Sequence, residues 1–191
     1  MDIREFCENL LKLYEEMSQE FSLAQSGNNL QCPSDCGRCC QNPSIEASVL
    51  EMLPMALYFH DNNLTDYYLD LIEHSMQTNQ FCIGIKNNRC HLYQTRPSIC
   101  RMFGVSAYLD KNRKAQASIC KTLKEINPQD SLKVAAAPLE HNLPVMPHWS
   151  AKLLTLDPGL EYPKMHINLA LKKAIEKVEL LLTYAESYTE Q

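Results

Sequence analysis

Cysteine is the residue type most able to do chemistry in this chain, which has nine cysteines in 191 residues. A thiolate is a soft anionic ligand that suits zinc, iron and iron–sulfur clusters. Cys7 falls on the apolar stripe of a predicted helix, and we expect it to be a buried core residue. The other eight cysteines gather in one loop and in the centre of the chain. These candidate metal ligands are Cys32, Cys36, Cys39, Cys40, Cys82, Cys90, Cys100 and Cys120.

The first four candidates lie in a loop in which proline and glycine break regular structure. Cys36-x2-Cys39 has the spacing of a zinc knuckle. With Cys32 added, the loop could hold three irons of a 4Fe–4S cluster, with a fourth ligand from elsewhere. Radical S-adenosylmethionine enzymes share this three-cysteine spacing. They usually have an aromatic residue where this chain has Arg38, and they need a βα barrel that this sequence does not predict.

Because Cys39 and Cys40 are adjacent, their thiols are expected to serve different places. Neighbouring side chains point in divergent directions in most backbone conformations, so we expect one thiol to serve the metal of the loop. The other would serve a second metal or the core. Eight thiols would fill two four-cysteine sites or one polynuclear cluster, and the sequence leaves both arrangements open.

A second motif follows in the centre of the chain: Cys90, Tyr93, Arg96, Pro97, Cys100 and Arg101. Together with the first loop, this motif resembles the YkgJ-type cysteine-cluster proteins, over about residues 30–120. The family pattern is C-x2-C-x2-C-C, whereas the first interval here has three residues. The resemblance implies a zinc- or iron-chelating domain, or an iron–sulfur protein. A larger relative with this cluster, the flagellin lysine N-methylase, keeps an enzymatic role open, but the sequence reveals no reaction or substrate.

Three residues of the second motif are predicted to support a bound cofactor. Arg96 and Arg101 would offset the negative charge of several thiolates, which lowers the thiol pKa and favours metal binding. Surface salt bridges are the alternative for both. Tyr93 would donate a hydrogen bond to a thiolate or would simply pack.

The elements that must position these residues are mostly helices. Apolar periodicity and capping signals predict helices over residues 2–25, 48–60, 65–78 and 163–187, with Pro54 kinking or dividing the second. Short hairpins are expected over residues 81–93, turning at Asn87-Asn88, and over residues 105–120. Residues 127–163 are proline-rich and read as irregular, with a short helix near residues 132–137.

The predicted fold class is therefore mainly α with small β-hairpins, an irregular α+β arrangement with a cysteine-rich metal-binding centre between helices. We expect one domain over residues 1–191, in which the amino-terminal and carboxy-terminal helices pack around the region 30–120.

The composition of the chain indicates where the protein is located and which partners it binds. A net charge of −5 and a pI of about 5.7 argue against nucleic-acid binding. No apolar run reaches the ~20 residues that a membrane helix needs, and the amino terminus lacks the features of a signal peptide. We therefore expect a cytoplasmic protein with a metal ion as its partner, no contact with membranes, and a protein partner that the sequence does not specify.

Three functional hypotheses follow from the cysteines. The first is an iron–sulfur cluster or polynuclear iron site with a redox or metal-assisted catalytic role. The second is a zinc-stabilised structural or interaction module, since closed four-cysteine zinc sites are usually structural. The third is a protein that stores or delivers metal.

Overall fold

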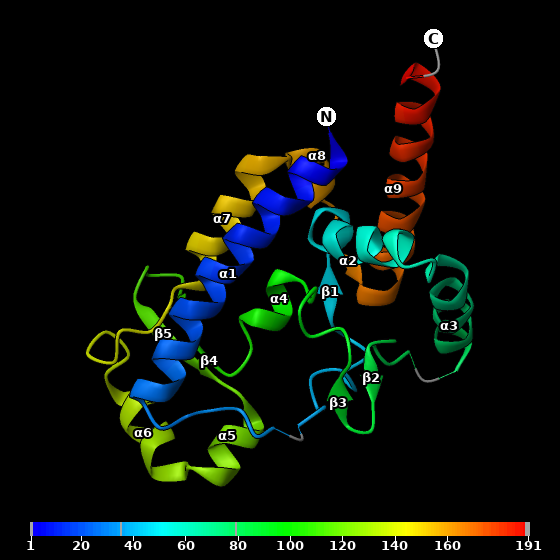
Figure 1. Ribbon diagram of the computed structural model, residues 1–191. Coiled ribbons are helices and arrows are strands. Elements are labelled where there is room, and N and C mark those ends of the chain that lie inside the picture. Colours follow the sequence, from blue (N-terminus) through cyan, green and yellow to red (C-terminus); the bar gives the residue numbers. More distant parts are fainter. Residues whose placement is uncertain (1, 35, 79, 190–191) are drawn as a thin grey trace. The chain divides into compact units, whose positions relative to one another are not determined.

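The computed structural model describes residues 2–34, 36–78 and 80–189 (Figure 1). Within these residues the chain is 57% helical, with nine helices and a few small antiparallel strand pairs, which confirms the predicted fold class. The chain divides into two compact units. Unit 1 comprises Met1–Leu13, Asp35–Pro97 and Asp157–Gln191, and unit 2 comprises Tyr14–Ser34 and Ser98–Leu156. The single domain expected over the whole chain stays a prediction.

Helix α1 (Ile3–Gly27) confirms the predicted amino-terminal helix. Its first residues belong to unit 1 and the remainder to unit 2. The carboxylate of Asp2 accepts a hydrogen bond from the backbone N–H of Arg4 at 2.9 Å, which satisfies one free donor of the first turn. Side chains three and four residues apart are buried along the helix: Ile3, Cys7, Leu10, Tyr14, Met17, Phe21 and Ala24.

Unit 1 is built on α2 (Val49–Asp61), α3 (Thr65–Gln77), α8 (Pro158–Glu161) and α9 (Ile167–Thr189). Helix α2 packs against the other three. The predicted capping box at its start is present, because Ser48 and Glu51 each bond the other's backbone N–H. Of the two effects expected of Pro54, division of the helix is wrong, because α2 is continuous from Val49 to Asp61. A kink at Pro54 stays a prediction.

Two short strand pairs complete unit 1. Strand β1 (Glu46–Ala47) pairs antiparallel with β6 (Met165–His166), so the chain just after the first cysteine loop meets the chain just before α9. Strands β2 (Ile85–Lys86) and β3 (Arg89–Cys90) form the predicted hairpin. Its turn residues have φ of 51° and 59°, a conformation that asparagine tolerates well.

Unit 2 contains the second predicted hairpin, formed by β4 (Val105–Leu109) and β5 (Ala115–Ile119). It also contains α4 (Ser98–Arg101), α5 (Lys121–Ile126), α6 (Pro128–Ala136) and α7 (Met146–Leu156). Apolar side chains from the hairpin and from the segments around it form the core of this unit: Leu30, Val105, Ala107, Ile119, Leu123, Val134 and Leu143.

The expectation that residues 127–163 are irregular apart from one short helix is wrong, because α6, α7 and α8 lie within them; α6 overlaps the short helix predicted near residues 132–137. Pro128 and Pro158 each occupy the first position of a helix, and Pro147 is the second residue of α7. Proline has no N–H to lose at these positions and its fixed φ suits a helix start. These prolines therefore begin helices instead of excluding them.

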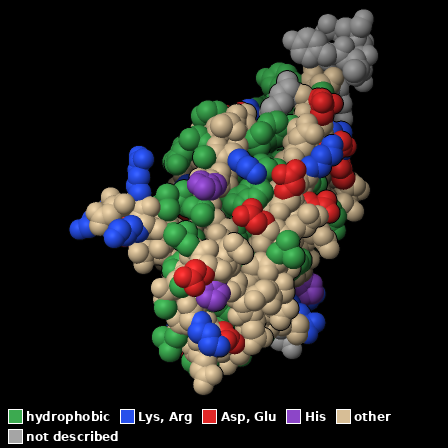
Figure 2. All heavy atoms as spheres, turned by 90° about the vertical axis from the view of Figure 1, so that its left-hand side faces the viewer, with side chains coloured by type: hydrophobic (Ala, Val, Ile, Leu, Met, Phe, Trp, Pro, Cys, Tyr) green, Lys and Arg blue, Asp and Glu red, His purple; other side chains and the backbone are tan. Residues whose placement is uncertain are grey.

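Charged side chains of both signs are interspersed on the face of the molecule shown in Figure 2. No large field of one sign dominates the described residues on that face. Among the described helices, none combines the length and the apolar content that crossing a lipid bilayer requires.

Candidate metal centre

Four thiols of unit 1 interact around Cys40. The Cys40 side chain is almost buried, with 8% of its surface exposed, and its thiol is within hydrogen-bond reach of the thiols of Cys39, Cys82 and Cys90. An S–H group has one proton and can point it at only one sulfur at a time. The arrangement therefore brings together more acceptor sulfurs than one thiol proton can satisfy.

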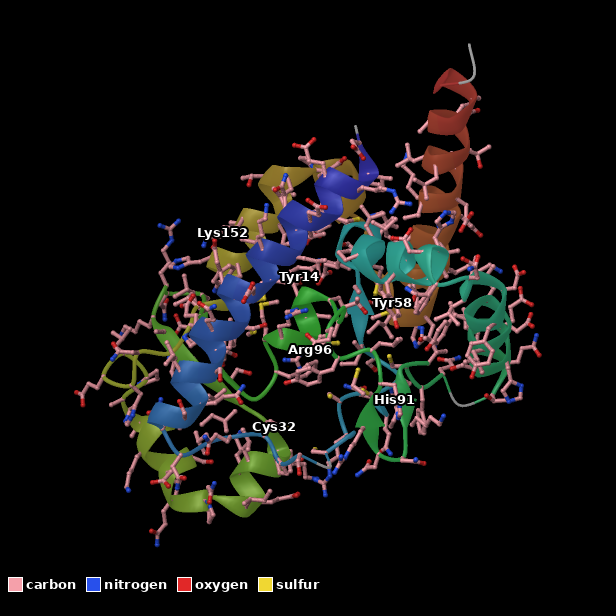
Figure 3. All side chains as sticks on the ribbon, in the orientation of Figure 1. Tyr14, Cys32, Tyr58, His91, Arg96 and Lys152 are labelled. Atoms are coloured by element: carbon pink, nitrogen blue, oxygen red, sulfur yellow. The ribbon has the colours of Figure 1, made fainter. Side chains whose placement is uncertain are left out.

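Two loops bring these sulfurs together. The first turns tightly, since the Cys40 N–H donates to the Gly37 carbonyl at 3.0 Å. The second is tied to the first by the Cys82 N–H, which donates to the Cys40 carbonyl at 2.9 Å. In Figure 3, sulfur atoms lie beside the β2–β3 hairpin, where His91 is labelled. The backbone thus joins cysteines that are about forty residues apart in sequence.

Gly37 permits the close approach of these segments, and Gly84 lies beside two of the sulfurs. A Cβ at Gly37 would lie 2.8 Å from the backbone oxygen of Asn88 in the hairpin turn, closer than real Cβ atoms come to other atoms. A Cβ at Gly84 would lie 3.6 Å from the Cys82 sulfur and 3.7 Å from the Cys90 sulfur. Glycine at 37 therefore lets the first loop contact the hairpin, whereas a Cβ at Gly84 would make only ordinary van der Waals contact with the two sulfurs.

Backbone N–H groups donate hydrogen bonds to the sulfurs of Cys82 and Cys90 with the same spacing in sequence. Cys82 accepts from the N–H of Gly84, and Cys90 accepts from the N–H of Leu92, each two residues further along the chain. An N–H group directed at sulfur favours the thiolate over the thiol, and it also orients the sulfur for a cation. Both segments are thus preorganised to present a negative sulfur.

The electrostatics divide the four thiols into one whose pKa is raised and three whose pKa values are lowered. Hydrogen bonding to the Cys40 thiol is the largest cause that lowers the pKa of Cys39 to about 6 and of Cys90 to about 7, against the opposing effect of burial. The same contact lowers the pKa of Cys82. In return, its three sulfur neighbours, together with burial, raise the pKa of Cys40.

The thiols of Cys39 and Cys40 are in hydrogen-bond contact, although adjacent side chains are expected to diverge. The reason is local: residues 38–41 form a tight turn in which the two sulfurs can reach one side. Both thiols therefore contribute to one group. Whether the two thiols serve different metals stays a prediction.

Arg96 acts on this group as predicted for a cation near thiolates. Its positive charge lowers the pKa of both Cys39 and Cys90. The guanidinium carbon lies 3.8 Å from the ring centroid of Tyr93, a cation–π contact that orients the arginine. Tyr93 itself is 55% exposed. Figure 3 labels Arg96 on the segment that follows β3. Direct contact of either residue with a bound cofactor stays a prediction.

The remaining predicted ligands do not all lie in unit 1. Cys36 is half-buried in the same loop as Cys39, whereas Cys32, Cys100 and Cys120 belong to unit 2. Cys32 is exposed (Figure 3), and Cys120 packs against the hydrophobic core of unit 2. Ligation by these four cysteines stays a prediction.

Arg101 belongs to unit 2 and contacts α1 there. It donates a hydrogen bond to the hydroxyl of Ser18 at 2.7 Å, and its guanidinium carbon lies 5.0 Å from the ring centroid of Tyr14. Its predicted role near a cofactor is untested.

Sequence reasoning missed Asn168, which supports the Cys82 loop. This asparagine is 1% exposed, and its side chain bonds backbone groups of Phe81 and Ile83, the two neighbours of Cys82. A polar residue at a buried position of α9, among the apolar residues of its first turns, was the available signal. The predicted buried face of this helix included only its apolar residues.

The residues fit a metal ion in their chemistry. Within the described part of the chain, no three His, Cys, Asp or Glu side chains already stand as ligands around a common point. The Cys40 thiol is instead within hydrogen-bond reach of the other three thiols. Loss of the Cys40 proton would free all four sulfurs to turn toward one cation. Such a donor set, with backbone N–H groups behind it, suits zinc or iron.

Comparison with known proteins agrees with the donor chemistry. Residues 31–123 match the family model of the CxxCxxCC domain, whose description reads "Putative zinc- or iron-chelating domain". This confirms the resemblance that the two cysteine motifs indicated, and it supports zinc or iron binding by this part of the chain. Neither a curated protein nor a solved structure matches the chain.

Proposed function

We propose that the CxxCxxCC domain of this chain binds a single zinc or iron ion through the thiolates of Cys39, Cys40, Cys82 and Cys90. The observation that carries this proposal is the contact of the Cys40 thiol with the other three thiols. A metal with bonds of ~2.3 Å to four sulfurs at tetrahedral angles holds those sulfurs roughly 3.8 Å apart. The Cys40 thiol already contacts the other three thiols, as a mononuclear site would require of it.

The electrostatics support the same assignment. A metal ion binds thiolates, so each thiol must lose its proton, and the lowered pKa values of Cys39, Cys82 and Cys90 reduce the work of that step near neutral pH. The Cys40 thiol is the one of these four whose pKa is raised, which is a barrier to its ionisation. A cation among four sulfurs removes that barrier, because it replaces the shared proton with a greater positive charge. Arg96 further offsets the charge of the thiolate group.

An iron–sulfur cluster with a redox role is the second candidate. The observation that favours it is Cys36, which lies in the same loop and unit as Cys39 and adds a fifth thiol. Bridging sulfides and several irons hold their cysteine ligands further apart than one metal ion does. This candidate thus requires the thiols that now touch Cys40 to move outward.

Metal and acid-labile sulfide content test the proposal, on full-length protein purified without oxygen. One zinc or iron ion per chain without sulfide is the expected result. Colourless zinc protein would favour a structural or interaction role, since zinc has no redox chemistry. Stoichiometric sulfide with several irons would overturn the mononuclear assignment and favour the cluster. Zinc that exchanges rapidly with a chelator, without unfolding of the protein, would favour storage or delivery over a structural role.

A further inference from the structure

Residues 165–168, which form β6 and the first residues of α9, bond both the chain shortly after Cys40 and the chain around Cys82. We call them the 165–168 segment; it lies outside the part of the chain that matches the CxxCxxCC domain. Strand β6 pairs with β1, and the Ile167 N–H donates to the Ile45 carbonyl at 2.9 Å. These bonds hold the chain shortly after Cys40. The same segment also holds the chain around Cys82.

Asn168 makes three hydrogen bonds with its side-chain amide. The amide NH₂ donates to the Phe81 carbonyl at 2.7 Å and to the Ser75 hydroxyl at 3.0 Å, and the amide oxygen accepts from the Ile83 N–H at 3.2 Å. One planar group therefore bonds the residue before Cys82 and the residue after it. Because the asparagine is 1% exposed, water has little access to replace these bonds.

His166 adds a further bond to the same loop. Its Nε2 lies 3.0 Å from the Gln80 carbonyl, which can only accept a hydrogen bond, so Nε2 carries the proton. Its Nδ1 then accepts from the Asn168 N–H at 3.3 Å. The histidine thus ties a third residue of the loop to the segment that positions the asparagine.

The loop itself has little regular structure to hold it. Cys82 lies between α3 and β2, outside both elements. Its carbonyl accepts from the Ile85 N–H at 3.1 Å, and the Ser75 hydroxyl donates to the Phe81 carbonyl at 2.6 Å. The side chain of Asn168 is the group that joins the two sides of the cysteine. Without it, the backbone on both sides of Cys82 would lose a buried partner.

We propose that Asn168 is a positioning residue of the metal centre, which fixes the Cys82 loop so that the Cys82 thiol faces the thiols of Cys39, Cys40 and Cys90. This inference rests on the proposed function of the four thiols. Outer groups that orient metal ligands typically contribute 10- to 100-fold to metal affinity. The carboxy-terminal helix would then be part of the metal site, although the chelating domain ends before it.

Cobalt(II) titration of the metal-free, reduced full chain tests this role, because thiolate-to-cobalt absorption reports both affinity and the number of bound thiolates. Asn168→Leu keeps the approximate size of the side chain and removes its three hydrogen bonds. We expect a 10- to 100-fold weaker affinity. We also expect a loss of about one quarter of the absorption per cobalt, as in a Cys82→Ser reference, since one of four ligands is released.

Asn28→Leu is the matched control. The side-chain amide of Asn28 also bonds backbone, donating to the Ala24 and His141 carbonyls at 2.7 and 3.1 Å. Asn28 and both partners belong to unit 2, whereas the four proposed ligands belong to unit 1. The cobalt affinity and spectrum of Asn28→Leu should stay within twofold of the unmodified chain. Asn168→Asp is a graded variant, which keeps the acceptor for Ile83 and loses the donors to Phe81 and Ser75. Its affinity should fall between those of the unmodified chain and Asn168→Leu.

The outcomes separate this inference from the proposed function. An unmodified chain that binds no cobalt would overturn the metal site itself. An unmodified chain that binds cobalt, together with a folded Asn168→Leu variant of equal affinity and spectrum, would overturn only the role of Asn168. If circular dichroism shows that Asn168→Leu does not fold, Asn168→Ala replaces it, since this change removes the same three hydrogen bonds with a smaller side chain. A severalfold weaker affinity then supports the inference, and an unchanged affinity refutes it.

Discussion

Substitution of Gly37 by alanine tests whether the first cysteine loop must contact the β2–β3 hairpin. The added methyl carbon would lie 2.8 Å from the Asn88 oxygen, about 0.6 Å inside the 3.4 Å at which ordinary contact begins. It would also lie 2.9 Å from the Asn88 carbonyl carbon, so the neighbour is backbone and cannot rotate away. The loop and the hairpin must therefore separate.

The expected magnitude follows from this overlap. Forcing one extra carbon into a close-packed contact costs about 1–3 kcal/mol of folding free energy. For a chain of this length, that range lowers the Tm by about 2–12 °C. The separation also moves Cys39 and Cys40 away from Cys82 and Cys90, so metal affinity should fall as well.

Thermal unfolding by circular dichroism and metal titration measure the two effects. Gly27→Ala is the control, because a Cβ at the last residue of α1 would meet no atom within 4 Å. Alanine there should leave metal affinity unchanged and keep or slightly raise the Tm, since it is the better helix former. Equal Tm values and equal affinities for the two variants would refute the close contact at Gly37.

Three further changes probe the charges of the fold. Arg96→Gln should shift the pH midpoint of metal binding upward, since the arginine lowers the pKa of Cys39 and of Cys90. Arg113→Gln, in an exposed turn, should leave the midpoint unchanged. Equal midpoints for the two variants in a pH titration would contradict this role of Arg96. Lys164→Met leaves the buried carboxylates of Glu51 and Glu161 without their cation, so it should lower the free energy of unfolding, measured in urea, by about 3 kcal/mol. The control Lys172→Met removes an exposed ion pair with Glu73 and should lower it by less than about 1 kcal/mol. Burial raises the pKa of Cys7 from 9.0 to about 12, so the stability that this thiol contributes is complete below pH 9 and is lost as pH rises toward 12. Cys7→Val should therefore flatten the decline of stability between pH 9 and 12, and an unchanged decline would count against burial as the cause.

Much of the fold could be predicted because its signals are local. The capping box of Ser48 and Glu51 and the turn at Asn87-Asn88 specify their own conformations from adjacent residues. Apolar periodicity specifies α1 and α9 in the same way. Proline at 128 and 158 misled the prediction, because the residue that breaks a helix interior also favours a helix start, and composition alone does not distinguish the two.

The sequence could predict that the site is made of thiolates, but not which cysteines come together in it. Cysteine type and spacing identify a thiolate site, yet whether Cys40 meets Cys39 depends on the turn around Gly37, and whether it meets Cys82 depends on long-range backbone pairing. Asn168 is over eighty residues from the loop that it bonds. Such contacts arise from tertiary packing, which residue spacing does not encode.

The central claim is that the thiols gathered around Cys40 hold the metal. Metal content per chain, measured on the unmodified protein, Cys40→Ser and Cys120→Ser after purification without oxygen, tests it most directly. We predict about one metal ion per chain for the unmodified protein and for Cys120→Ser, whose cysteine packs against the core of unit 2, and a severalfold loss for Cys40→Ser. Full metal content in folded Cys40→Ser protein would contradict the account.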